Sequence, residues 1–143
     1  IDCDRGDGFV VLEEVLAAGK RFNAYAADDA HFHTPHAGGG WVMVKAEAHE
    51  PELLLSALKQ GHFYSSQGPQ IHDIAVIDND VRVACSSAIS VSISGSGTGS
   101  RSEHGCGLTH ATLSLDPFRE GCYFRVTVTD DKGRRAWSNP IWL

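Results

Sequence analysis

The sequence predicts an α+β fold, in which an α/β segment is followed by a small antiparallel β-sandwich. Two observations support this prediction. A helical apolar pattern over residues 9–16 is followed within a few residues by a strand-like run over 22–27, and a helix leading into a buried strand is the repeating unit of α/β folds. From residue 70 onward, short strand-like segments alternate with turns, as is typical of sandwiches. We therefore expect two domains, residues 1–68 and 69–143.

The first domain is expected to contain two helices and three extended segments. The first helix, Gly8–Ala18, has apolar residues at helical spacing and a glycine after its last turn. The second helix, Pro51–Lys59, begins with a proline, which first turns favour, and it stops at Gly61. The extended segments are the strand Phe22–Ala27, the strand Trp41–Lys45 and the stretch His62–Ser66.

The second domain is expected to consist of strands and turns alone. The turns Asp78–Asp80 and Asp131–Gly133 each predict a hairpin. Gly95–Gly107 is rich in glycine and serine, and it is expected to be either a flexible loop or disordered. The predicted strands are Ile71–Ile77, Val81–Cys85, Ile89–Ser94, Thr109–Leu115, Gly121–Asp130 and Arg134–Trp142.

Composition and charge exclude several classes of function. The 143 residues include 42% hydrophobic and 21% charged side chains, which is ordinary for a globular protein. The net charge of −6 and the lack of a Lys/Arg cluster argue against a nucleic-acid surface. No apolar run approaches the roughly 20 residues that span a bilayer, so no membrane partner is expected. The four cysteines include no CxxC pair, which favours reduced thiols in a cytoplasmic protein.

A candidate metal site follows the strand predicted over Phe22–Ala27. Residues two apart in an extended chain point the same way, so the side chains of Asp29 and His31 are expected to project together. A carboxylate beside an imidazole is half of a metal site, because a catalytic zinc takes about three protein ligands. His33 and His36 are close enough in the sequence to extend the site; the alternative is that both are exposed loop histidines.

Several segments, taken in this order, resemble the C-terminal part of PHP-domain proteins, the polymerase and histidinol phosphatase superfamily of metal-dependent phosphoesterases. These segments are Ala26–His31, Gly39–Val44 and Gly61–Ser66, the last followed by Gly68-Pro69. The closing run Trp137–Trp142 resembles the end of a β-rich tail that occurs in one bacterial subgroup. The similarity extends over nearly the whole chain, from about residue 9 to residue 143.

The resemblance implies that residues 1–68 are the remnant of a distorted (βα)7 barrel, and that Asp29 and His31 form the family's last metal-binding motif. The family's other ligands come from earlier motifs, beginning with a His-x-His pair. Here the only His-x-His, His31-Phe32-His33, overlaps the last motif instead of preceding it. The chain is therefore expected to be the C-terminal fragment of a longer protein.

The activity that the resemblance implies is the hydrolysis of phosphate esters. About two or three divalent ions, of Zn, Mn or Fe, would bind the phosphate oxygens and deprotonate a water molecule that attacks phosphorus. Asp29 and His31 would be metal ligands, and Asp28 would accept a hydrogen bond from a ligating imidazole. The fragment itself is expected to be inactive, with metal absent or partly bound, because most of the ligands are missing.

Two further expectations accompany this one. The alternative to an enzyme is a non-catalytic β-sandwich that serves as a binding or assembly module and keeps a vestigial metal motif. In addition, a single αβ unit leaves apolar surface uncovered, so we expect a homodimer formed through residues 9–45.

Overall fold

The computed structural model describes residues 8–28, 30–31, 37–97, 99–118 and 122–143. Within these ranges the chain forms two helices and eight strands. The helices are α1 (Phe9–Ala17) and α2 (Pro51–Gln60). The strands are β1 (Trp41–Val44), β2 (Phe63–Ser66), β3 (Ile71–Ile77), β4 (Asp80–Gly95), β5 (Ser100–Ser114), β6 (Tyr123–Thr129), β7 (Arg135–Ser138) and β8 (Ile141–Trp142).

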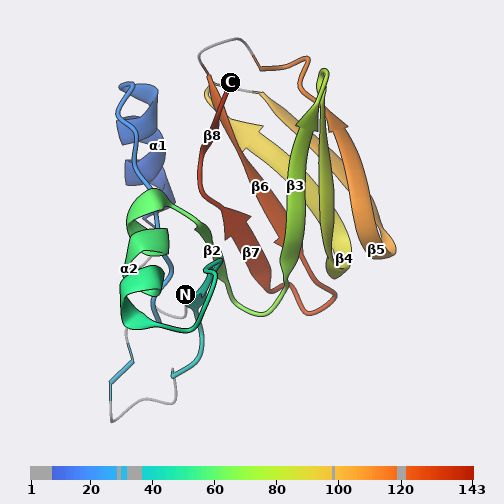
Figure 1. Ribbon diagram of the computed structural model, residues 1–143. Coiled ribbons are helices and arrows are strands. Elements are labelled where there is room, and N and C mark those ends of the chain that lie inside the picture. The colour runs from blue at the N-terminus through green and yellow to red at the C-terminus, as the bar shows by residue number, and fades with distance from the viewer. Residues whose placement is uncertain (1–7, 29, 32–36, 98, 119–121) are drawn as a thin grey trace.

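The described strands form one antiparallel sheet that curls into a half-barrel (Figure 1). Its order is β1-β2-β7-β6-β4-β3, with β5 paired to β4 and β8 paired to β6. The long strand β4 changes neighbours along its length: residues 80–84 lie between β3 and β5, whereas residues 90–94 lie between β5 and β6. The β4–β5 register shifts between Ala84 and Ser90, and irregularities of this kind bend a strand.

The hydrophobic core lies inside the curl, because strands from both of its arms contribute to one cluster of buried side chains. Side chains alternate between the two faces of a strand. Phe124, Val126 and Val128 of β6 therefore face this core, whereas Tyr123 and Arg125 face outward. The buried members of the cluster are Val81, Val83, Cys85, Ala88, Val91, Ile93, Ala111, Leu113, Leu115, Phe118, Phe124, Val126, Val128 and Ala136.

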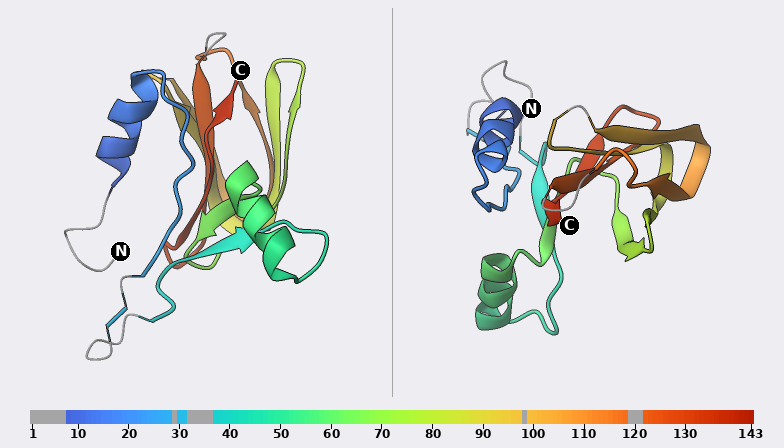
Figure 2. Two further views of the ribbon diagram at one scale, coloured as in Figure 1. Left: turned by 60° about the vertical axis from the view of Figure 1, so that its left-hand side comes forward. Right: turned by 90° about the horizontal axis from the view of Figure 1, so that it is seen from above.

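Helix α1 covers part of the outward face of β6. The Glu13 carboxylate accepts hydrogen bonds from the Tyr123 hydroxyl and the Arg125 guanidinium, and Leu16 is only 1% exposed. Both helices lie on the same side of the sheet (Figure 2). The prediction of this helix is confirmed, since the observed ends differ from the predicted ones by one residue each.

The prediction of helix α2 is confirmed, and so are the roles of the proline and the glycine at its two ends. Pro51 occupies the first turn, and Gly61 follows the helix in the left-handed conformation with φ of 77°. A Cβ at residue 61 would lie 2.5 Å from the side-chain nitrogen of Asn23. Glycine is therefore favoured there by both its backbone angle and the nearby side chain.

The predicted α+β fold class, with an α/β remnant of a (βα)7 barrel, is wrong. The described part of the chain is mostly β, and its strand pairs are antiparallel. Residues 22–27, predicted as a strand, have no strand partner among the described residues. The physical reason is that β2, beside which they run, already pairs with β1 and β7. The same sheet also crosses the predicted boundary between residues 68 and 69.

The segment rich in glycine and serine also differs from its prediction. Strand β4 runs on to Gly95, and β5 begins at Ser100, so much of the predicted loop Gly95–Gly107 is strand. Pairing with β4 supplies the backbone hydrogen bonds that its composition alone does not suggest. A Cβ at Gly95 would lie 1.9 Å from the Tyr123 carbonyl oxygen, so glycine is required where β4 approaches β6.

Candidate functional site

Two of the five predicted site residues lie within the described ranges. Asp28 is half-buried and His31 is exposed, in the connection that leads from residues 22–27 toward β1. Asp29, His33 and His36 lie outside the described residues. In the part of the chain that is described, no three His, Cys, Asp or Glu side chains form a group that could hold a metal ion. The metal site therefore stays a prediction.

The Asp28 carboxylate bridges the backbone at the two ends of the connection between residues 28 and 38. One of its carboxylate oxygens accepts a hydrogen bond from the Ala30 N–H at 3.2 Å, and the other accepts one from the Gly38 N–H at 2.5 Å. The bond from Gly38 lowers the pKa of the Asp28 carboxyl below its ordinary value, and it outweighs the desolvation that would raise this pKa. An ionised carboxylate thus ties together the two ends of the connection that contains Asp29 and His31.

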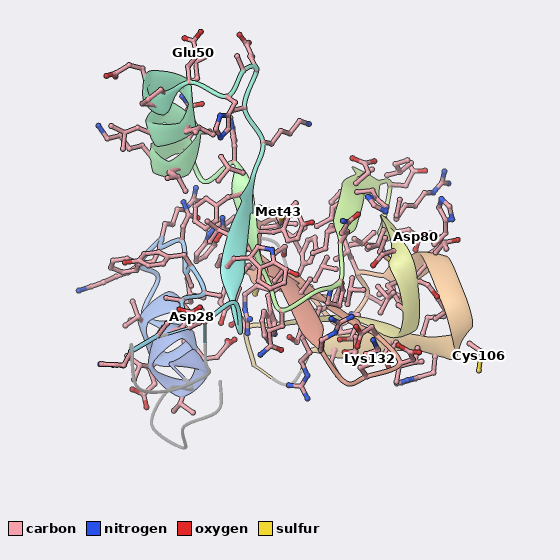
Figure 3. All side chains as sticks on the ribbon, turned by 90° about the horizontal axis from the view of Figure 1, so that it is seen from below. Asp28, Met43, Glu50, Asp80, Cys106 and Lys132 are labelled. Atoms are coloured by element: carbon pink, nitrogen blue, oxygen red, sulfur yellow. The ribbon has the colours of Figure 1, made fainter. Side chains whose placement is uncertain are left out.

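A pocket of about 190 Å³ lies beside the residues next to Asp28 and Gly38. Its walls come from α1, the extended segment Ala24–Ala27, the residues before β1, and strands β2 and β7. Ala27 and Gly39 line it, and they are the neighbours in sequence of Asp28 and Gly38. The pocket therefore adjoins the hydrogen bond between the Gly38 N–H and the Asp28 carboxylate. Figure 3 shows Asp28 on the side of the molecule that carries α1, with Cys106 on the opposite side.

One side chain of β2 fixes the extended segment that forms a wall of the pocket. The Ser65 hydroxyl accepts a hydrogen bond from the Ala26 N–H at 2.9 Å and donates one to the Ala24 carbonyl at 3.4 Å. Ser65 itself is 7% exposed. It therefore gives the segment the kind of backbone pairing that a neighbouring strand would otherwise provide.

A polar cluster of the half-buried Glu13 with the buried Tyr123 and Arg125 reaches the same pocket through Arg125. Arg125 lines the pocket and is 6% exposed, and its positive charge is balanced by the Glu13 carboxylate. Burial raises the pKa of Tyr123 to about 12, and the hydrogen bond to Glu13 and its negative charge add to the shift. The Tyr123 hydroxyl is therefore neutral, and it donates to Glu13, near neutral pH.

Other polar side chains of the lining are also engaged within the chain. The Ser138 hydroxyl accepts a hydrogen bond from the Val126 N–H at 2.9 Å and donates to the Asn139 carbonyl at 2.8 Å. The side-chain oxygen of Gln67 accepts a hydrogen bond from the Arg135 N–H at 3.2 Å. What the pocket offers a ligand is therefore mostly apolar surface.

Sequence reasoning missed this pocket and its polar cluster. Glu13 and Arg125 are 112 positions apart, so no local pattern connects them. One signal was available: Arg125 interrupts the otherwise uncharged run of β6, and a charge within a buried strand needs a partner of opposite sign. The partner cannot be chosen from the sequence, because the helix that carries Glu13 has a second glutamate beside it.

Exposed apolar side chains are found on α1 and on the segment after it. Val10 is 68% exposed and Tyr25 is 75% exposed. Both lie within residues 9–45, the region of the predicted homodimer, which stays a prediction. Neither helix in the described ranges is both long and apolar enough to cross a membrane.

The resemblance to PHP-domain proteins stays a prediction. Comparison of the chain with family models, with curated proteins and with solved structures finds no match.

Proposed function

We propose that this chain is the C-terminal part of a divalent-metal-dependent phosphoesterase, in which Asp29 and His31 contribute two metal ligands. The ordered motifs that resemble PHP-domain proteins support this proposal. The remaining ligands come from residues outside this sequence, since a catalytic site needs more than two of them. The substrate is a phosphate ester, and the fragment alone is inactive.

The contact between Asp28 and Gly38 is the observation that carries the proposal. A metal site requires its ligands to be held close to one geometry before the ion binds. Asp28 accepts hydrogen bonds from the Ala30 and Gly38 N–H groups with its two carboxylate oxygens, so it links the backbone on the two sides of His31. These backbone contacts are our support for a positioning role of Asp28 in the proposed motif; its hydrogen bond to a ligating imidazole stays a prediction.

The chemistry follows from the types of residue in the motif. Zn, Mn or Fe ions held by carboxylates and imidazoles polarise phosphate oxygens and lower the pKa of a bound water molecule. Within this chain, Asp29 supplies a negatively charged oxygen ligand and His31 a neutral nitrogen ligand.

The proposal is tested by titrating the chain with Zn²⁺ and Mn²⁺ and by measuring the bound metal. The chain is expected to bind metal weakly and reversibly, because two protein ligands leave most coordination positions to water. Asp29→Ala and His31→Ala should each weaken this binding at least about tenfold. His49→Ala is the matched control, since His49 is also exposed but lies outside the motif. Metal binding that is unchanged in Asp29→Ala and His31→Ala would contradict the proposal.

A second candidate, a non-catalytic binding or assembly module, is favoured by the pocket beside α1. All of its lining residues lie within the described ranges, so it needs no residue from outside the chain. The two candidates differ in one result: only the phosphoesterase requires the Asp29 and His31 side chains. For either candidate we propose a cytoplasmic location, which is supported by the free thiols of Cys85, Cys106 and Cys122.

A further inference from the structure

The size of the pocket beside α1 limits what can occupy it. Its volume is about 190 Å³. An apolar cavity of roughly 150 Å³ inside a protein stays dry and binds benzene. A pocket slightly larger than that accommodates one aromatic ring with a small substituent, whereas a nucleotide or a disaccharide would not fit inside it as a whole.

The chemistry of the lining limits the ligand further. The hydroxyls of Ser65 and Ser138 donate to carbonyl groups of the chain, and the Arg125 charge is balanced by Glu13. An anionic ligand would lose its hydration on entering and would compete with Glu13 for Arg125, which is costly. An uncharged ligand gains contact with apolar walls formed by residues such as Leu12, Ala26 and Pro140.

From this volume and lining, we propose that the pocket binds a single uncharged aromatic ring of the phenol class. Leu12 of α1, Ala26 of the extended segment and Pro140 after β7 contact the ring. The small residues Gly39 and Gly40 leave the space in which it lies. Ala27 and Gly39, which also line the pocket, are the sequence neighbours of Asp28 and Gly38, the two residues that the Asp28 hydrogen bond joins.

This placement also specifies the substrate class, and that step rests on the proposed function. A phosphate ester has its phosphorus at the metal ions and its alcohol group beside them. The pocket is lined by Ala27 and Gly39, which are close in sequence to the proposed ligands, and this indicates esters of aromatic alcohols as substrates, with the ring in the pocket and the charged phosphate outside it.

The test is a titration of the 143-residue chain with phenol, without added metal, followed by amide NMR shifts. We expect saturable binding with a Kd on the order of 1 mM, as for a ligand with few non-hydrogen atoms, and shifts centred on Ala26 and Gly40. Benzoate, which has the same ring and a negative charge, should bind at least about tenfold more weakly.

Two variants fill the pocket from different walls. Ala26→Leu adds carbon atoms to the extended segment. Gly40→Leu does so from the residue before β1, where a Cβ meets only ordinary contacts, the nearest being the Ala26 Cβ and the Ala27 carbonyl oxygen at 3.6 Å. Each is expected to weaken phenol binding at least about tenfold, because it occupies the space of the ring. Ala17→Leu, at an exposed position of α1 outside the pocket, is the matched control and should bind phenol normally.

The outcomes separate this inference from the proposed function. Absence of saturable phenol binding, or binding that both filling variants retain, overturns the pocket inference. Benzoate binding tighter than phenol overturns the uncharged class. Phenol binding that persists in Asp29→Ala supports the pocket regardless of the metal result, since no metal ligand lines it. If Asp29→Ala loses metal binding but neither the unchanged chain nor any variant binds phenol, the proposed function stands. In that case the aromatic substrate class is ruled out.

Discussion

Glu13 of α1 and Arg125 of β6 form an ion pair that joins positions 112 residues apart in the sequence. The second carboxylate oxygen of Glu13 accepts a hydrogen bond from the Tyr123 hydroxyl. Tyr123 and Arg125 are two positions apart on a strand, so they project from the same face. One carboxylate therefore satisfies two buried donors and fixes the helix against the sheet.

Glu13→Gln should destabilise the chain. The amide keeps the shape of the side chain but removes the charge that balances Arg125, which is 6% exposed. We expect a loss of about 1–2 kcal/mol, at the low end for charge-assisted hydrogen bonds because the Glu13 side chain is 36% exposed. Urea unfolding at neutral pH measures the change. Glu14→Gln, on the exposed side of the same helix, is the control, and an equal loss in both variants would refute the role of Glu13.

Tyr123 should make the fold sensitive to alkaline pH. Its pKa in the fold is about 12, against an ordinary value of 10.0, so the folded chain holds the phenolic proton more tightly than the unfolded chain. The resulting stabilisation is complete below pH 10 and is lost as the pH rises through 12, the pKa of the folded state. A late step in tyrosinate absorbance should report this ionisation. This late step should be missing in Tyr123→Phe and present in Tyr25→Phe. If the step persists in Tyr123→Phe, it belongs to another tyrosine and the prediction is wrong.

Asp28→Asn should loosen the base of the predicted metal motif. The variant removes the negative charge that accepts the N–H groups of Ala30 and Gly38, so the Gly38 amide should exchange its hydrogen faster. In the unchanged chain, the pKa of the Asp28 carboxyl is lowered from its ordinary value of 3.8. The stabilisation by its hydrogen bonds is therefore complete above pH 3.8, and it is lost as the pH falls through the lower pKa of the folded state.

The Gly38 amide shift, followed against pH, measures the Asp28 titration directly. A midpoint below 3.8 agrees with the structure, and a midpoint above 3.8 contradicts it. Asp131→Asn, which changes an exposed carboxylate far along the chain, should leave both the exchange rate and the shift of the Gly38 amide unchanged.

The sequence predicted the elements whose causes are local. Pro51 and Gly61 mark the two ends of α2 because a proline suits the first turn and a glycine suits the left-handed residue after the last. The hairpin of β3 and β4 follows from alternation around a short turn. These features depend on neighbours in sequence, which a single chain displays.

The predictions that failed concern segments whose structure depends on partners far away in the sequence. Residues 22–27 have the composition of a buried strand, but whether they pair is decided by β2, whose two edges are taken by β1 and β7. Residues 100–107 have the composition of a loop, yet β4 is long enough to pair with them. The pocket could not be predicted for the same reason, since Ser65 and Ser138 meet Ala26 and Val126 only after the sheet has formed.

The change of neighbours along β4 has a consequence for aggregation. This strand alternates Val81, Val83, Val91 and Ile93 with smaller or polar residues, and an exposed strand edge of that kind is a template for pairing with other chains. In the fold, β3 and β5 cover both edges of its first part, and β5 and β6 cover both edges of its last part. The longest strand of the described chain is thus shielded on both sides in the folded state. Open edges belong to β5, which pairs with β4 alone among the described strands, and to the shorter strands β1 and β3.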